Sequence, residues 1–291
     1  MEAPKLVMHL QTSRYLSTLE QGSGAVLLHG EFGVGKRTLA LEVARRLNCL
    51  GCSDQSCASC RQVAGRNHPN ISVVEPDAKG KIGIEAAQEL QHDLQYAQYQ
   101  DGRRVIIIAD ADTLTIPAAN SLLKVIEEPP PDTLIIITAI SPSALLDTIV
   151  SRCRPIFVAK PTEKSLVEFL VNQYHQSAAA AQELVQLSRG LPGLAVSLAM
   201  NEDAWEQHRQ ARALAEEFSQ QTLFGRLQIV AKLGKDPIMT ELLLQSLTQL
   251  SRVLTRSGEA PGLQSIIDAR LNIKANVAPK MALEALAVRL P

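Results

Sequence analysis

Residues 25–48 read AVLLHGEFGVGKRTLALEVARRLN and decide the fold. A short apolar run leads into a glycine-rich loop, and an apolar residue at every fourth position from Leu39 to Leu47 then predicts a helix. A strand, a GxxxxGK loop and a helix in this order form a phosphate-binding loop, in which backbone N–H groups wrap a phosphate chain and the lysine adds charge. An unliganded turn is the plainer alternative. The candidate nucleotide-binding residues are Gly30, Gly33, Gly35, Lys36 and Thr38.

Strand-like and helix-like stretches alternate as far as residue 160. Runs at 71–74, 105–108, 134–137 and 155–158 predict strands, and the two central ones are apolar at every position. Strands of a parallel sheet that helices cover on both faces show this pattern. Helices are predicted over 84–99 and 118–127. We therefore predict a doubly wound α/β P-loop domain with a parallel sheet at residues 1–160.

The strand signals end after residue 160. Helices over 163–174, 178–188 and 192–200 predict a small three-helix lid at residues 161–201, with Thr162 as the first N-cap. The remaining residues, 202–291, predict an all-α C-terminal domain whose helices span 205–218, 223–233, 237–254, 262–271 and 277–290.

Composition excludes several classes of function. The 291 residues hold 29 Lys and Arg against 30 Asp and Glu, and this net charge of −1 excludes a broadly basic nucleic-acid coat. One Trp, four Tyr and five Phe are too few for a base-stacking surface. No apolar run reaches the roughly 18 residues of a membrane helix, and residues 1–16 lack the continuous apolar segment of a secretory signal. We expect a cytoplasmic protein without a membrane partner.

The residue after the loop lysine is wrong for magnesium. A working phosphate loop has Ser or Thr there, because the hydroxyl ligates Mg²⁺. This chain has Arg37, which places a cation where a cation should bind. Thr38 comes one residue later, which is a rotation of about 100° on a helix.

The acidic motif that should follow the strand at 105–108 is also incomplete. An Asp–Glu pair is expected, but the chain reads Ala109-Asp110-Ala111-Asp112. Either Ala109 replaces the metal-binding Asp, or Asp110 holds that place and Ala111 replaces the catalytic Glu. One carboxylate is missing in both registers, so we do not expect independent ATP hydrolysis.

Four of the five cysteines lie within twelve residues, at Cys49, Cys52, Cys57 and Cys60. Two Cys-x2-Cys pairs suit a tetrahedral zinc site, and four thiolates leave no position for a reactive water. In a reducing compartment clustered thiols more often hold metal than form disulfides. We predict a structural Zn²⁺ at residues 49–60, with unliganded thiols or disulfides as alternatives. His68 is expected to be a packed turn residue.

Several motifs together resemble one family. They are the loop at 30–38, the cysteine cluster with His68-Pro69, the run at 109–112, the block ANSLLKVIEEPP at 119–130, and Ser151-Arg152-Cys153. In this combination the chain is similar to the delta-prime family of bacterial sliding-clamp loader subunits, which are AAA+ proteins of the DNA polymerase III holoenzyme. The resemblance is strong over roughly the first two thirds of the chain and weak over the terminal helices.

The resemblance implies an AAA+ module, a lid and a helical collar that joins five subunits, gamma/tau-type ATPases and delta among them, into an open ring. In that family the motor subunits hydrolyse ATP and delta-prime is a largely rigid stator, which reaches the sliding clamp and primer–template DNA mainly through the complex, at the replisome on the nucleoid. The family's sensor-1 polar residue falls at Ile140 and its sensor-2 arginine at Gly193, so both sensors are altered. Whether ATP or ADP still occupies the loop stays open.

The motif Ser151-Arg152-Cys153 is intact. In the family its arginine crosses the subunit boundary to a neighbour's nucleotide, where an arginine finger raises rates about 10³–10⁵-fold in other systems. A guanidinium suits bidentate phosphate contact, and a solvated arginine at a loop–strand junction is the plainer alternative. We expect Arg152 to act in trans, and Cys153 to be a buried apolar residue.

The leading hypothesis is a non-hydrolysing stator that supports ATP-dependent loading of the clamp onto primed DNA. An ATP-hydrolysing motor-type subunit is the main rival. A P-loop nucleotide kinase would need a basic lid, whereas residues 178–181 are four alanines. A free zinc-dependent DNA-binding module is the third rival hypothesis, and the near balance of basic and acidic residues argues against it. The pairs Arg45-Arg46 and Arg103-Arg104 are expected to be solvent-exposed.

Overall fold

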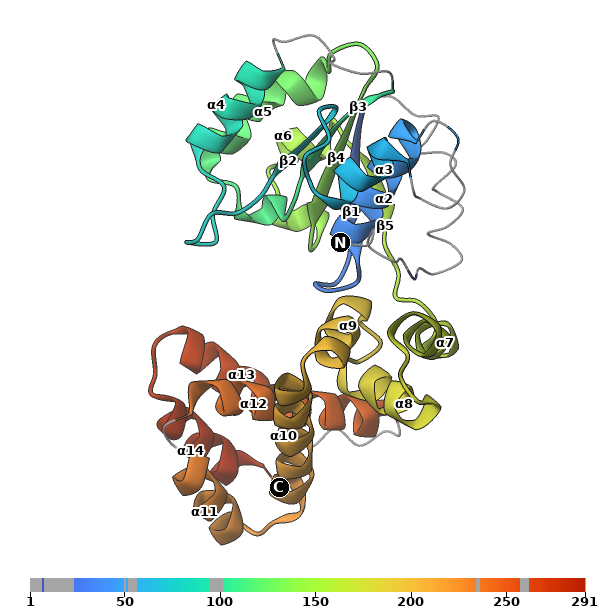
Figure 1. The fold of residues 1–291 in the computed structure, drawn as a ribbon. Helices are drawn as coiled ribbons and strands as arrows, with labels where there is room; N and C mark the ends of the chain where they lie inside the picture. The colour runs from blue at the N-terminus through green and yellow to red at the C-terminus, as the bar shows by residue number, and fades with distance from the viewer. Residues whose placement is uncertain are drawn as a thin grey trace. The chain divides into compact units, whose positions relative to one another are not determined.

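The computed structural model describes residues 24–49, 57–94, 102–233, 236–256 and 262–290, together with residues 7 and 51. The chain forms two compact units, Met1–Val196 and Ser197–Pro291. The first contains a sheet and its helices, and the second contains helices (Figure 1). Within the described ranges, no helix is both long and apolar enough to cross a membrane.

A five-stranded sheet forms the centre of the first unit. Every neighbouring pair is parallel, and the order is β2-β3-β4-β1-β5. The predicted parallel α/β architecture is confirmed. The loops that follow β1, β3 and β4 leave the sheet at one edge, where open α/β sheets bind their ligands. The strands are β1 (Gly24–His29), β2 (Ile71–Val74), β3 (Arg104–Ile108), β4 (Thr133–Ala139) and β5 (Arg154–Phe157).

Helices cover both faces of the sheet. Helices α4 (Ile84–Asp93) and α5 (Ile116–Glu127) pack against one face, and α2 (Lys36–Asn48) packs against the other (Figure 1). Side chains of β3 alternate between the two layers, so that Ile106 joins the first and Ile107 the second. All residues of β3 and β4 are buried, which explains their unbroken apolar runs.

Some limits differ from the prediction. Helix α5 begins two residues before its predicted start, because the Thr115 hydroxyl accepts a hydrogen bond from the Ala118 N–H at 3.4 Å and caps the helix. Helix α4 ends at Asp93, and residues 95–99 of the helix predicted over 84–99 lie outside the described part. Short elements that were not predicted are α3 (Ala58–Ala64), η1 (Ala111–Thr113), η2 (Pro142–Ala144) and α6 (Asp147–Val150).

Three helices follow the sheet, as predicted: α7 (Glu163–Tyr174), α8 (Ala178–Leu187) and α9 (Pro192–Met200). The Thr162 hydroxyl accepts the Ser165 N–H at 3.2 Å and caps α7, as expected. The boundary between the compact units falls inside α9, after Val196. A division of the chain at residues 160 and 201 stays a prediction.

The second unit contains a buried arginine in addition to its apolar core. Arg226 is 6% exposed, and its guanidinium donates to the carbonyls of Phe218 at 3.1 Å and Leu290 at 2.7 Å. These carbonyls lie near two helix C-termini, where a cation is favourable. The helices are α10 (Glu202–Gln220), α11 (Leu223–Leu233), α12 (Pro237–Arg256), α13 (Leu263–Lys274) and α14 (Pro279–Arg289).

Candidate functional site

The glycine-rich loop joins β1 to α2 at the ligand-binding edge of the sheet. Gly33 and Gly35 have φ of 80° and 98°, which L side chains rarely adopt. A Cβ on Gly30 would lie 2.6 Å from the Val158 carbonyl oxygen. These three positions of the predicted site therefore require glycine. Thr38 lies in the second helical position after Lys36.

The Lys36 ammonium contacts its own loop. It donates to the carbonyl oxygen of Gly30 at 2.8 Å and to that of Glu31 at 3.1 Å, and the residue is 6% exposed. Burial lowers the pKa of Lys36, while the carboxylates of Asp110 and Asp112 act in the opposite direction. The lysine predicted to bind phosphate therefore has two hydrogen-bond partners within its own loop.

The start of α9 lies directly on this loop. The Gly193 N–H donates to the Gly33 carbonyl at 2.9 Å, and a Cβ on Gly193 would lie only 2.9 Å from the same oxygen. The Lys160 ammonium adds an ion pair to the Glu31 carboxylate at 2.6 Å. At Gly193, where the resemblance places the family's sensor-2 arginine, this backbone contact therefore admits only glycine.

Arg37 has an acidic partner that the sequence did not reveal. Its guanidinium pairs with the Glu75 carboxylate, directly after β2, and Arg66 approaches the same carboxylate at 3.6 Å. The Arg37 Nε is buried without a hydrogen-bond partner among the described residues. Glu75 therefore balances the charge of Arg37, the residue that stands where a working phosphate loop has Ser or Thr.

The acidic run after β3 holds neighbouring backbone. Ala109 is buried and continues the pairing with β2, since its N–H donates to the Val74 carbonyl at 2.9 Å. Asp110 has φ 51° and donates its N–H to the Thr138 hydroxyl at 2.9 Å. The Asp112 carboxylate accepts the N–H of Ile140, where the resemblance places sensor 1, at 3.2 Å. The Asp112 carboxylate therefore holds the backbone at the end of β4.

The Ser151-Arg152-Cys153 triplet lies between α6 and β5, and its side chains differ in burial. Arg152 is exposed: its Nε donates to the Glu127 carboxylate at 3.2 Å and its Nη1 to the Thr148 carbonyl at 3.0 Å. Cys153 is 8% exposed and belongs to the core beneath α5, and burial raises the pKa of its thiol to about 11. A thiol with this pKa stays protonated, as expected for a packing residue.

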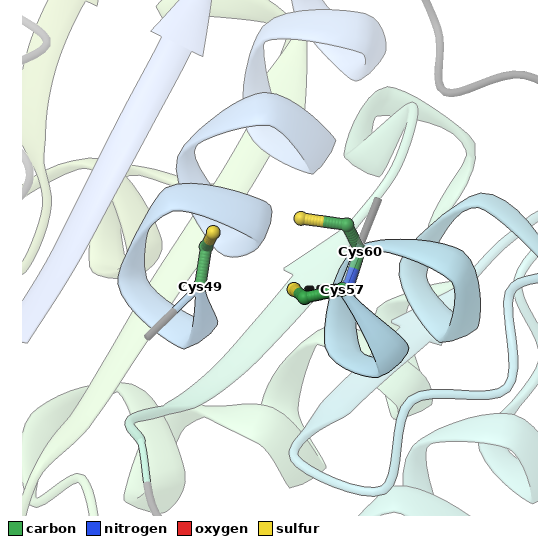
Figure 2. A group of neighbouring side chains, drawn as sticks. All are labelled: Cys49, Cys57 and Cys60. Atoms are coloured by element: carbon green, nitrogen blue, oxygen red, sulfur yellow. Dashed lines mark hydrogen bonds between the residues drawn. The ribbon is translucent and has the colours of Figure 1, made fainter. Parts of the chain in front are cut away.

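Three of the four predicted metal ligands lie together (Figure 2). The sulfur atoms of Cys49, Cys57 and Cys60 are all within 4.8 Å of one another. A tetrahedral zinc with Zn–S of about 2.3 Å needs S···S separations of about 3.8 Å, so small side-chain shifts suffice. The Cys60 N–H donates to the Cys57 sulfur at 3.4 Å, which suits a thiolate. Cys52 lies outside the described residues.

His68 belongs to a buried polar network beside the cysteines. Its Nδ1 accepts the Asn70 N–H at 3.2 Å, so Nε2 carries the proton toward the Ser59 hydroxyl at 3.0 Å. Ser59 in turn donates to the Asn48 carbonyl at 2.8 Å. His68 is 4% exposed, and burial lowers its pKa. The prediction of a packed turn residue is confirmed.

Two arginines that the sequence placed in solvent are buried instead. Arg104 is 9% exposed and donates to the Leu94 carbonyl at 3.2 Å, and Arg45 is 8% exposed. Arg45 lies between Glu42, whose carboxylate pairs with it, and Cys60, whose sulfur accepts a hydrogen bond from it. The Leu94 carbonyl and the Cys60 sulfur reach these arginines only through the fold. The one signal of burial in the sequence was Glu42, at helical spacing from Arg45.

Comparison with known proteins places the chain in a family. The family model described as DNA polymerase III, delta subunit, matches residues 4–162. DNA polymerase III subunit delta' of Bacillus subtilis is 36% identical over 156 residues, 52% of this chain and 46% of its own length. The subunit delta' of Escherichia coli is 31% identical over 216 residues, 72% of this chain and 63% of its own length. The chain thus spans about half to two thirds of these relatives.

Similarity extends to related subunits and to a solved fold. DNA polymerase III subunit gamma/tau of Mycoplasma genitalium is 33% identical over 148 residues, 50% of this chain and 24% of its own length. The crystal structure of a gamma-subunit-related protein from Thermotoga maritima matches with a TM-score of 0.55 at 22% identity, over 96% of this chain and 98% of that one, which is a likeness of fold. Because the family match spans more than half of the chain and several relatives over these residues are delta' subunits, this chain belongs to the DNA polymerase III delta-prime family.

Proposed function

We propose that this chain is a non-hydrolysing stator of the DNA polymerase III clamp loader, and that Arg152 acts in trans as an arginine finger at a neighbouring ATPase subunit. One observation carries the proposal. The Lys36 ammonium is buried against the carbonyls of its own loop, whereas Arg152 is exposed. The altered positions Arg37, Ala109 or Ala111, Ile140 and Gly193 support the absence of hydrolysis.

The proposed assembly follows from the relatives. Proteins similar to this chain are named delta' and gamma/tau subunits of DNA polymerase III. We propose that gamma/tau-type ATPases and delta are its partners in a hetero-pentamer, joined through helices of the second unit. The sliding clamp and primer–template DNA would then be reached through the complex, in the cytoplasm.

The proposed cofactor is a structural Zn²⁺ held by Cys49, Cys57 and Cys60, with Cys52 as the fourth ligand. The clustered sulfur atoms support it. Such a metal would link the end of α2 to α3 and leave no open position for chemistry. Full-length protein purified under reducing conditions should hold about one zinc per chain, and less than about half an equivalent would contradict the site.

We propose that the glycine-rich loop at residues 30–36 does not hydrolyse ATP. Phosphate could still displace the loop carbonyls from Lys36, so nucleotide binding and hydrolysis are separate questions. One observation favours the motor-type alternative. The carboxylates of Asp110 and Asp112 both raise the pKa of Lys36, so acidic groups act on the loop lysine. Steady hydrolysis of ATP by the isolated chain, abolished by Lys36→Ala, would select that alternative.

Reconstitution with gamma/tau-type ATPases and delta tests the finger. We expect Arg152→Ala to assemble normally and to lower DNA-stimulated ATP turnover about tenfold or more, because a finger is worth roughly 10³–10⁵ at the site it serves. Arg154→Ala is the matched control: Arg154 is exposed, basic and two residues away. It should leave turnover unchanged. Equal turnover of the wild type and Arg152→Ala would contradict the proposal.

A further inference from the structure

A buried cation lies behind the cysteine cluster. Arg45 is on α2, one turn before Cys49, and is 8% exposed. Its Nη1 donates to the Cys60 sulfur at 3.5 Å. Its Nε and Nη2 donate to the two carboxylate oxygens of Glu42, each at 2.8 Å. One guanidinium therefore joins a carboxylate to a sulfur atom.

Glu42 holds this guanidinium in place. It is 7% exposed and also accepts the Arg46 Nε at 2.8 Å. Burial alone would raise the pKa of Glu42, but the hydrogen bonds from Arg45 and Arg46 outweigh burial and keep it below the ordinary value. The two parallel hydrogen bonds from Arg45 to this carboxylate fix the orientation of the planar guanidinium.

The sulfur that Arg45 contacts is the one that water reaches least. Cys60 is 1% exposed, whereas Cys49 and Cys57 are half-buried. A zinc ion with three or four thiolates carries one or two net negative charges, and a buried charge is costly unless it is paired. Groups that hydrogen-bond to metal ligands orient them and tune the metal.

We propose, on the premise that the cluster holds zinc, that Arg45 sets the zinc affinity of this site by pairing with the Cys60 thiolate. Arg45 is a positioning residue: it touches a ligand and not the metal. The plainer alternative is that Arg45 only stabilises α2 through its ion pair with Glu42. Arg46 separates the two, because it pairs with the same carboxylate from a side chain that is 42% exposed.

The test is competitive titration of zinc against a chromophoric chelator, on the full-length chain under reducing conditions. Arg45→Met keeps the length and apolar stem of the side chain, and Arg46→Met is the matched control. We expect Arg45→Met to weaken zinc binding about 10–100-fold, the usual effect of losing a partner of a metal ligand. Arg46→Met should stay within about twofold of the wild type. Circular dichroism of the zinc-loaded variants checks the fold.

Arg45→Gln keeps the test decisive if Arg45→Met does not fold, since glutamine can still donate but carries no charge. It should also weaken zinc binding. Wild-type affinity in the folded Arg45 variants, or an equal loss in Arg46→Met, would overturn the inference while leaving the zinc site intact. A wild-type chain with under half an equivalent of zinc would instead overturn the zinc proposal, and this inference with it.

Discussion

The glycine-rich loop and the Ser151–Cys153 triplet each present a basic side chain, and the two differ in what that side chain contacts. Lys36 is buried, and its ammonium donates to two carbonyls of its own loop. Arg152 is exposed, and its Nη2 has no hydrogen-bond partner among the described residues. The cation of the predicted phosphate-binding loop therefore has partners inside that loop, while Arg152 keeps a donor without a partner among the described residues.

The glycine-rich loop also contacts Gly193 at the start of α9, where the largest effect on stability is expected. Gly193→Ala would place a Cβ 2.9 Å from the Gly33 carbonyl oxygen. We expect a loss of about 1–3 kcal/mol in the free energy of unfolding, as for other overpacked sites. A helix ordinarily gains up to about 1 kcal/mol from this substitution, so the sign is diagnostic. Thermal unfolding measures it.

Ser197→Ala, at an exposed position of the same helix, is the control for Gly193→Ala. It should change stability by less than about 0.5 kcal/mol. A Gly193→Ala variant as stable as this control would show that the start of α9 does not press on the loop.

The orientation of the exposed Arg152 depends on Glu127, and we expect a smaller effect from substituting this acid. Its carboxylate accepts from the Arg152 Nε at 3.2 Å and so orients the guanidinium. Exposed ion pairs are worth about 0.2–1 kcal/mol. Glu127→Gln should therefore lower the DNA-stimulated ATP turnover of a reconstituted loader about two- to fivefold, with the same Kd for assembly.

Glu128→Gln, at the neighbouring exposed acid, should leave this turnover unchanged. In an Arg152→Ala background Glu127→Gln should have no further effect, because Glu127 acts through that guanidinium. Independent effects of the two substitutions would mean that Glu127 does not orient the arginine.

The strands and most helices could be predicted because their signals are local in the sequence, whereas contacts between distant residues could not. Apolar runs predicted the sheet because both faces of β3 and β4 are covered. The partner of Arg37 is Glu75, 38 residues away, and no periodicity joins them. Arg45-Arg46 read as a solvated pair because burial of the first depends on how α3 packs beside α2. The start of α5 was missed although its signal is local, since Thr115 before Ile116-Pro117 is a capping signal.

The smallest effect concerns Cys153, the buried member of the triplet. Burial raises its pKa to about 11, so the thiolate that reacts with alkylating agents is scarce at pH 8. We expect iodoacetamide to leave Cys153 unmodified in the native chain at pH 8 and to modify it after denaturation, as mass spectrometry of peptides would show. Rapid native labelling would contradict the burial of this residue.

The most direct test of the central contrast substitutes both cations in one reconstituted loader. DNA-stimulated ATP turnover is measured with Lys36→Ala and Arg152→Ala chains under identical conditions. We predict that Lys36→Ala keeps turnover within about twofold of the wild type, while Arg152→Ala loses about tenfold or more. A large loss with Lys36→Ala and wild-type turnover with Arg152→Ala would contradict it, because the chain would then use its own nucleotide site and not serve its neighbour's.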